Sequence, residues 1–134
     1  MSDEATRAVV ERLQAVWESG DLQAIGAAML EVAADDLVQE FPQSGERFHG
    51  RDNVLAMNSA YTSETGTQPT MTPTRVRGGG DIWVAEGTID YGNGTSVKAV
   101  SIIELKDGKV LSTTDYFASP FEAPEWRRKY AERP

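Results

Sequence analysis

Residues 82–117, IWVAEGTIDYGNGTSVKAVSIIELKDGKVLSTTDYF, decide the fold of this chain. Three runs rich in apolar and β-branched residues occupy positions 82–91, 95–106 and 109–117. The short sequences between them, Gly-Asn-Gly and Asp-Gly, favour tight hairpin turns. A further run at 74–77 precedes them across Gly-Gly-Gly-Asp. The stretch therefore predicts four consecutive antiparallel strands.

The part of the chain before these strands predicts helices. Apolar residues such as Val9, Leu13 and Trp17 recur at three- and four-residue spacing, which is the period of an amphipathic helix. Such helices are expected over residues 4–19, 22–32 and 51–62. Short strands are expected at 37–41 and 46–49, and a loop rich in Thr, Ser, Gly and Pro at 63–72.

This order of elements indicates an α+β fold. Helices that precede a run of antiparallel strands predict one sheet with its helices gathered on one face. The length of 134 residues fits a single domain, 1–134. Residues 120–134 form a tail in which Pro124 is a suitable start for a short helix.

Composition excludes several classes of function. The chain has no cysteine and one histidine, so thiol chemistry, disulfides and sites that need two imidazoles are ruled out. A net charge of -8 argues against binding to nucleic acid or to anionic membranes. No apolar run approaches the length of a membrane span, and the acidic start lacks a signal sequence, so we expect a cytoplasmic protein.

The strand at 95–106 has apolar residues on both faces. Val97, Ala99 and Ile103 point to one side, and Val100 and Ile102 to the other. An antiparallel strand with one solvated face alternates apolar and polar residues, so both faces of this strand need cover. We expect the helices on one side and, through Val100 and Ile102, a second copy of the chain on the other. The alternative is that the C-terminal segment folds over this outer face.

Several motifs together resemble the nuclear transport factor 2-like superfamily, in particular its SnoaL-like and limonene-epoxide-hydrolase-like branch. They are the two N-terminal helices followed by Ala34-Asp35-Asp36-Leu37-Val38, then Phe48-His49-Gly50-Arg51-Asp52-Asn53-Val54, and last a four-strand meander that ends in Thr114-Asp115-Tyr116-Phe117. The resemblance covers nearly the whole chain. It implies a cone, in which a curved mixed or antiparallel sheet wraps around three helices and leaves a pocket between them. Dimers that pack through the outer face of the sheet are common in such families.

The resemblance transfers catalytic residues unevenly. Limonene-epoxide hydrolases use an Asp–Arg–Asp group with a Tyr and an Asn, and the second Asp falls on Asp115. The Arg and the first Asp fall on Gly87 and Ile89, and the Tyr and Asn fall on Gln39 and Phe41. Epoxide hydrolysis by that mechanism is therefore disfavoured. SnoaL-like cyclases use one Asp in a late strand as acid and base, which Asp115 alone can satisfy.

Strand parity predicts which side chains line the pocket. Side chains two residues apart on a strand share a face, so Asp115 brings Thr113 and Phe117 with it. The pocket is expected to be mostly apolar with few polar groups, as is typical of a site for a small organic ligand. Its expected lining is Trp17, Leu37, Gln39, Phe41, Met57, Tyr61, Ala85, Gly87, Ile89, Val97, Ala99, Ser101, Ile103, Thr113 and Phe117, with Met29 beside them.

Asp115 is the candidate catalytic residue. Apolar surroundings disfavour its charged form and raise its pKa, so it can take a proton next to a carbonyl or give one to an oxyanion, with Gln39 or Tyr61 as a hydrogen-bond donor. The alternative is that Asp115 pairs with an arginine or caps a turn.

Other residues suggest weaker roles. Asp35-Asp36, without further ligands, reads as a turn between helix and strand, so neither a metal nor a cofactor is expected. His49 reads as a surface or pocket-rim residue, and Trp126 and Tyr130 as cover for the pocket mouth or for a partner subunit. Three functions stay open: an isomerase or cyclase, a non-catalytic ligand-binding protein, and an interaction module that uses the outer sheet face.

Overall fold

The computed structural model describes residues 2–133, which form three α-helices, six strands and one 3₁₀ helix. The helices are α1 (Ser2–Glu18), α2 (Leu22–Glu31) and α3 (Arg51–Thr65), and the 3₁₀ helix is η1 (Glu125–Tyr130). The strands are β1 (Ala33–Phe41), β2 (Glu46–His49), β3 (Thr70–Gly79), β4 (Ile82–Asp90), β5 (Ser96–Lys106) and β6 (Lys109–Ala118). None of these helices combines the length and apolar character that crossing a bilayer requires.

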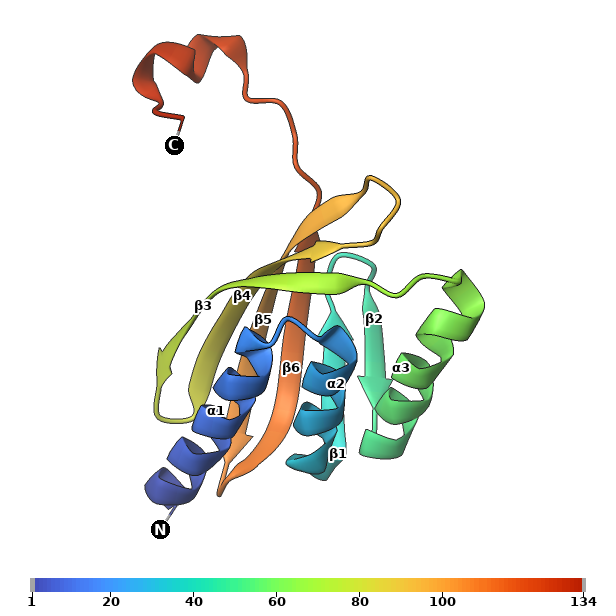
Figure 1. The fold of residues 1–134 in the computed structure, drawn as a ribbon. Coiled ribbons are helices and arrows are strands. Elements are labelled where there is room, and N and C mark those ends of the chain that lie inside the picture. The colour runs from blue at the N-terminus through green and yellow to red at the C-terminus, as the bar shows by residue number, and fades with distance from the viewer. Residues whose placement is uncertain (1, 134) are drawn as a thin grey trace.

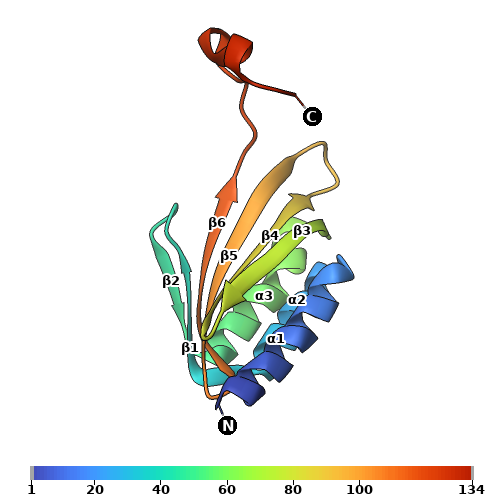
Figure 2. The same cartoon turned by 90° about the vertical axis from the view of Figure 1, so that its left-hand side faces the viewer.

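All six strands belong to one curved sheet in the order β2-β1-β6-β5-β4-β3. Every neighbouring pair is antiparallel except β1 and β6, which run parallel. The three α-helices cover one face of this sheet, as Figures 1 and 2 show from two directions. The α+β prediction is therefore confirmed, as is the antiparallel run of β3 to β6.

Tight turns fix the register of the antiparallel strands. Asp107 and Gly108, between β5 and β6, both have positive φ, which a type I′ hairpin turn requires. The resulting register sets Ser101 opposite Asp115, and Ala85 opposite Ser101. Because side chains of paired residues lie on the same face, this register gathers all three on one face of the sheet.

Two element boundaries differ from the prediction. β1 begins at Ala33 rather than at Leu37, because Ala33 and Ala34 are already buried, so Asp35 and Asp36 lie within the strand and not in a turn. The loop expected at 63–72 is shorter, because α3 continues to Thr65 and β3 begins at Thr70. Pro73 lies within β3, which is an edge strand of the sheet. Proline has no backbone N–H to donate, and an edge strand tolerates it because only one side of the strand pairs with a neighbour. The short helix expected after Pro124 is present as the 3₁₀ helix η1.

The core lies between the helices and the sheet and has two parts. Leu37 and Val110 are its most completely buried large side chains, and they belong to the first part together with residues of α1, α2, α3 and β5. The second part is Met71, Ile89, Val97 and Ala99. Trp17 of α1 packs against both parts and therefore joins them.

The C-terminal segment stands apart from this body. It leaves the end of β6 and projects away from both the helices and the sheet (Figures 1 and 2). Trp126 and Tyr130 are 70% and 76% exposed. Neither side chain therefore covers a pocket of its own chain, and the segment does not fold over its own outer sheet face.

The position of the core predicts that two leucines contribute very differently to the free energy of unfolding. Leu37 is 1% exposed in β1, whereas Leu55 is 50% exposed on α3. Leu37→Ala should lower the free energy of unfolding by about 2–5 kcal/mol, because it removes buried methyl groups and leaves a cavity. Leu55→Ala should change it by about 0.5 kcal/mol or less. Urea unfolding followed by circular dichroism measures both, and equal losses would contradict this placement of the core.

Candidate functional site

A cavity of about 1010 Å³ lies between the helices and the concave face of the sheet. Its wall is mostly apolar and includes side chains from all three α-helices and from five of the strands. Asp21 and Asp115 are the charged residues in this wall, and it contains no Lys, Arg or His. A wall without a cation offers nothing to neutralise an anionic ligand, so its chemistry disfavours one.

Short side chains on the sheet make room for the cavity. Ala85 of β4 and Ala99 and Ser101 of β5 form part of the wall beneath the helices. Larger residues at these positions would fill the space between the layers. These three residues, called the floor below, therefore leave space between the sheet and the helices.

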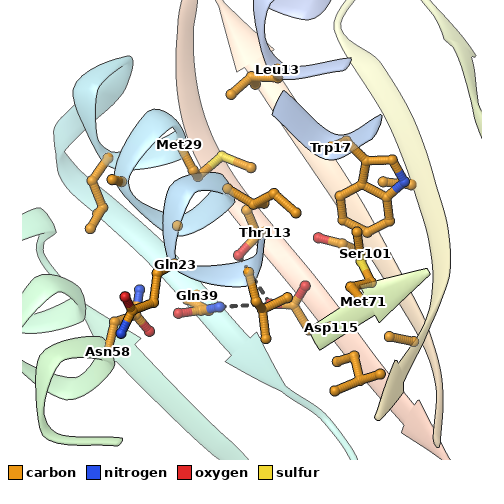
Figure 3. Close-up of a pocket in the computed structure, with 18 of the residues that line it drawn as sticks. Leu13, Trp17, Gln23, Met29, Gln39, Asn58, Met71, Ser101, Thr113 and Asp115 are labelled. Carbon is orange, nitrogen blue, oxygen red and sulfur yellow. Dashed lines mark hydrogen bonds between the residues drawn. The ribbon is translucent and has the colours of Figure 1, made fainter. Parts of the chain in front are cut away.

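Asp115 stands at the centre of the polar part of the wall. It is 9% exposed on β6. Gln39 Nε2 donates a hydrogen bond of 2.8 Å to Asp115 Oδ2, and Thr113 Oγ1 donates one of 3.3 Å to the same oxygen (Figure 3).

Burial raises the pKa of Asp115 above its ordinary value, because an apolar wall disfavours the charged carboxylate. Hydrogen bonds from Ser101, Gln39 and Thr113 act in the opposite direction, since they stabilise the carboxylate. Burial is the larger effect. The alternative, an ion pair of Asp115 with an arginine, is not present among residues 2–133, where the ion pairs involve other carboxylates.

The parallel pairing of β1 with β6 brings Gln39 to Asp115. Gln39 pairs with Thr113 in this register, so its side chain lies beside the face that carries Thr113 and Asp115. The amide nitrogen of Gln39 therefore gives one of its two N–H groups to the carboxylate. Gln39 Oε1 and the indole nitrogen of Trp17 are both buried without a hydrogen-bond partner in the described part of the chain. Unpaired buried polar atoms cost about 1–3 kcal/mol each, which a ligand or a water molecule could offset.

Aromatic rings close one side of the cavity. The rings of Phe41 and Phe117 meet edge to face with their centres 5.2 Å apart, and Phe48 packs on Phe41 from behind at 5.0 Å. Partial burial also raises the pKa of the Tyr91 phenol, which therefore stays protonated at neutral pH. This side of the wall is suited to flat apolar groups.

The structure places most of the predicted lining residues around the cavity. Gly87 and Val97 are the exceptions. Both are buried, but Val97 packs against Met71, Ile89 and Ala99, and Met71 covers Gly87, where an added Cβ would lie 3.0 Å from the Met71 sulfur. The residues that do line it are Trp17, Met29, Leu37, Gln39, Phe41, Met57, Tyr61, Ala85, Ile89, Ala99, Ser101, Ile103, Thr113, Asp115 and Phe117.

Sequence reasoning missed a set of polar residues on the helices. Gln14 of α1, Gln23 of α2 and Asn58 of α3 all line the cavity, and Figure 3 shows Gln23 beside Asn58. Polar residues on amphipathic helices predict solvent exposure, so no sequence signal separated these from the outward-facing ones. His49, by contrast, is an exposed residue of β2 outside the cavity wall, in agreement with a surface position.

Comparison with known proteins shows the family of this chain. Residues 10–113 match the family model described as a SnoaL-like domain. No curated protein matches the chain.

Among solved structures, an NTF-2-like protein of unknown function from Burkholderia xenovorans LB400 is similar, with 34% identity and a TM-score of 0.77. The match covers 100% of this chain and 98% of that one. A proposed ketosteroid isomerase from Kribbella flavida DSM 17836 is 25% identical with a TM-score of 0.76, over 98% of this chain and 91% of that one. A proposed polyketide cyclase from Sinorhizobium meliloti, 19% identical over 78% of this chain and 93% of that one, has a TM-score of 0.62 and shares the fold.

The raised pKa of Asp115 predicts how stability depends on pH. The folded state binds the Asp115 proton more tightly than the unfolded state does, so stability from this group is greatest at acid pH and is lost as pH rises through the folded pKa. Asp115→Asn, which keeps an oxygen for Gln39, should therefore stabilise the protein at pH 7 by about 1.4 kcal/mol for each unit of the shift. The gain should vanish below pH 4. Urea unfolding at several pH values measures it, and a gain independent of pH would contradict the assignment.

Proposed function

Because the chain belongs to the family of SnoaL-like domains, within the NTF2-like superfamily, we propose that its small-molecule pocket is an active site. The proposed activity is isomerisation or cyclisation of an uncharged, mostly apolar carbonyl compound, with Asp115 as general acid and base. The observation that carries it is a single buried carboxyl group in a mostly apolar wall, with its pKa raised by burial. The ketosteroid isomerase and polyketide cyclase among the similar structures agree with this reaction class.

The proposed chemistry follows from the protonation of Asp115. As a carboxylate, Asp115 takes a proton from the carbon next to the carbonyl, and the raised pKa makes this carboxylate a better proton acceptor than an exposed one. In an isomerisation, the proton then returns at another carbon. In a cyclisation, the deprotonated carbon attacks a second carbonyl carbon of the same molecule, and the proton goes to the alkoxide oxygen that this attack creates. Because one N–H of Gln39 already donates to Asp115, the developing oxyanion needs the second N–H of that amide or another donor. Two residues of the wall carry such donors: Tyr61 has a hydroxyl, and Trp17 has an indole N–H that is buried without a partner.

A non-catalytic ligand-binding protein is the second candidate. The wall has few other acid or base groups, and that observation favours binding without turnover. Epoxide hydrolysis is disfavoured further, because Gly87 and Ile89, at the positions of the hydrolase Arg and Asp, bring no charge to the site. The two remaining candidates share a pocket and differ in what Asp115 does.

Proton exchange from a small ketone distinguishes them. 2-Tetralone is uncharged, bicyclic and has exchangeable protons beside its carbonyl. The protein should accelerate their exchange with D₂O, and Asp115→Asn should reduce the acceleration about a hundredfold or more while 2-tetralone still binds. Asp36→Asn, the same change on an exposed residue of β1 outside the wall, is the control and should have no effect. Nuclear magnetic resonance measures both exchange and binding. Binding with no acceleration by the unmodified protein would favour the non-catalytic function.

We also propose that the protein is a homodimer that packs through the outer face of its sheet. Ile82 and Val84 of β4, Val100 and Ile102 of β5, and Tyr116 of β6 point away from the helices and are called the outer-sheet patch. Strand pairing sets Val84 opposite Ile102 and Val100 opposite Tyr116, so the patch is continuous. Its members are exposed or half-buried in the single chain. Contiguous apolar surface of this kind marks a contact site.

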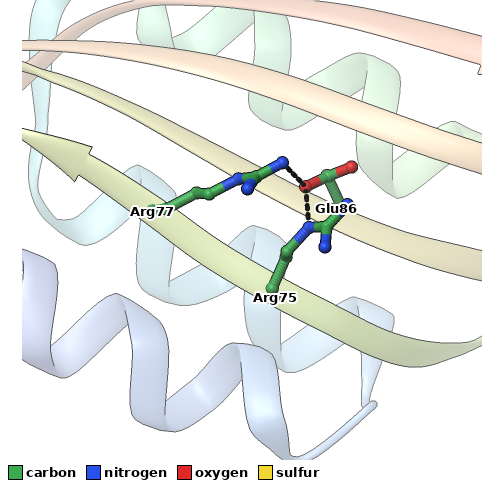
Figure 4. Close-up of polar contacts among 3 residues, drawn as sticks. All are labelled: Arg75, Arg77 and Glu86. Carbon is green, nitrogen blue, oxygen red and sulfur yellow. Dashed lines mark hydrogen bonds and ion pairs between the residues drawn. The ribbon is translucent and has the colours of Figure 1, made fainter.

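Charged residues border the patch on the β3 side. Arg75 Nε lies 2.6 Å from Glu86 Oε2, and Arg77 Nη2 lies 3.5 Å from the same oxygen (Figure 4). The hydrogen bond from Arg75 lowers the pKa of Glu86, which therefore stays ionised. A polar border around an apolar centre is the usual arrangement of a protein–protein interface.

The patch can be tested by a charge at its centre. Ile102→Glu should convert the dimer to a monomer, because each copy would bury an unpaired carboxylate in the interface. Lys98→Glu changes a residue on the same strand and the same face but outside the patch, and should leave the dimer intact. Sedimentation velocity over a range of concentrations measures the dimer dissociation constant. A monomeric unmodified protein, or a dimer unaffected by Ile102→Glu, would contradict this interface.

A further inference from the structure

The segment that follows β6, residues 119–133, is a projecting arm that buries no residue of η1. Phe121, Trp126 and Tyr130 are 81%, 70% and 76% exposed, the three largest exposures among the big hydrophobic residues of the described chain. Figures 1 and 2 show the arm outside both layers of the fold. Three exposed aromatic rings on one short segment are a large apolar surface without cover.

The interactions of the arm are internal to it. Arg127 lies over the Trp126 ring at 5.9 Å, and Lys129 lies over the Tyr130 ring at 5.1 Å. Arg128 pairs with Glu125 at 3.7 Å, also within η1. Trp, Tyr and Arg are the residue types that contribute most of the binding energy at protein interfaces. The arm therefore has the character of an interface segment whose partner surface lies outside its own chain.

The distribution of charge favours a second copy of this chain as the partner of the arm. Residues 119–134 carry four cationic and three anionic side chains, whereas residues 1–118 carry nine cationic and eighteen anionic ones. The body is thus strongly acidic, and three consecutive cations, Arg127, Arg128 and Lys129, sit among the exposed rings of the arm. Opposite charge draws the arm to the acidic body of a second copy.

The arm also starts close to the outer-sheet patch and is long enough to reach a second subunit there. It begins directly after Ala118, two residues beyond Tyr116 of the outer-sheet patch. The six residues between β6 and η1 span about 20 Å when extended. Two sheets packed face to face lie about 10 Å apart, so an arm leaving one sheet at the interface can reach the other subunit.

We propose that the arm docks on the body of a second copy of this chain, beside the partner's outer-sheet patch, so that a dimer exchanges two arms. Phe121, Trp126 and Tyr130 supply the apolar contacts, and the Arg127–Lys129 cations face acidic side chains of the partner. This inference rests on the proposed dimer, and it adds a second contact region to it.

Two measurements on the full chain test the arm. The first compares the dimer dissociation constant of the unmodified protein with that of the triple variant Phe121→Ser, Trp126→Ser, Tyr130→Ser. The constant should rise at least tenfold, because the arm contact is lost while the outer-sheet patch remains. Leu55→Ser, which alters an exposed large hydrophobic residue on α3, is the control and should leave the constant unchanged.

The second measurement identifies the surface that the arm contacts. A photoreactive benzoylphenylalanine replaces Trp126 in a mixture of ¹⁴N- and ¹⁵N-labelled copies, and mass spectrometry of the crosslinks separates contacts between copies from those within one copy. Crosslinks from the arm to residues 1–118 of the other copy support the proposal. Crosslinks confined to the same copy overturn it.

The outcomes separate this inference from the dimer itself. A triple variant with an unchanged dissociation constant overturns the arm contact, while the loss of the dimer in Ile102→Glu still supports the outer-sheet interface. An unmodified protein that is monomeric at every concentration overturns both.

Discussion

The site depends on one strand contact, the parallel pairing of β1 with β6. These strands are far apart in sequence, and their pairing is what sets the Gln39 amide 2.8 Å from Asp115 Oδ2. Without that donor, the buried carboxyl would keep only the hydroxyls of its own strand and of β5. The parallel contact therefore both joins β1 and β2 to the rest of the sheet and supplies a hydrogen-bond donor to the buried acid.

The same contact explains why an acid is tolerated in an apolar wall. A carboxylate without partners would be too costly to bury, and a carboxylate with an arginine would be locked in its ionised form. Asp115 has neutral donors instead, which lower the cost of ionisation without removing the effect of burial. The group can therefore change its protonation state, at the expense of stability at neutral pH.

Much of the fold followed from local sequence, since the turn residues and the alternation in β4, β5 and β6 act over short distances. Parity also placed Thr113, Ser101 and Phe117 around Asp115 correctly, because the period of a strand is fixed. Three features needed the assembled structure. Met71 covers Gly87 because of packing between β3 and β4, polar Gln23 and Asn58 face inward because of helix orientation, and the parallel β1–β6 pairing is a long-range contact. No local pattern encodes any of these.

The short residues of the floor have a consequence for how this scaffold can diverge. Ala85, Ala99 and Ser101 stand on well-paired central strands, so a change in their size alters the volume above them while the backbone stays in place. Gly87 offers no such freedom, because Met71 and the Thr72 carbonyl already lie 3.0 Å from any added Cβ. Ligand preference in this lineage is thus open to stepwise evolution at a few floor positions, independently of the acid that stands beside them.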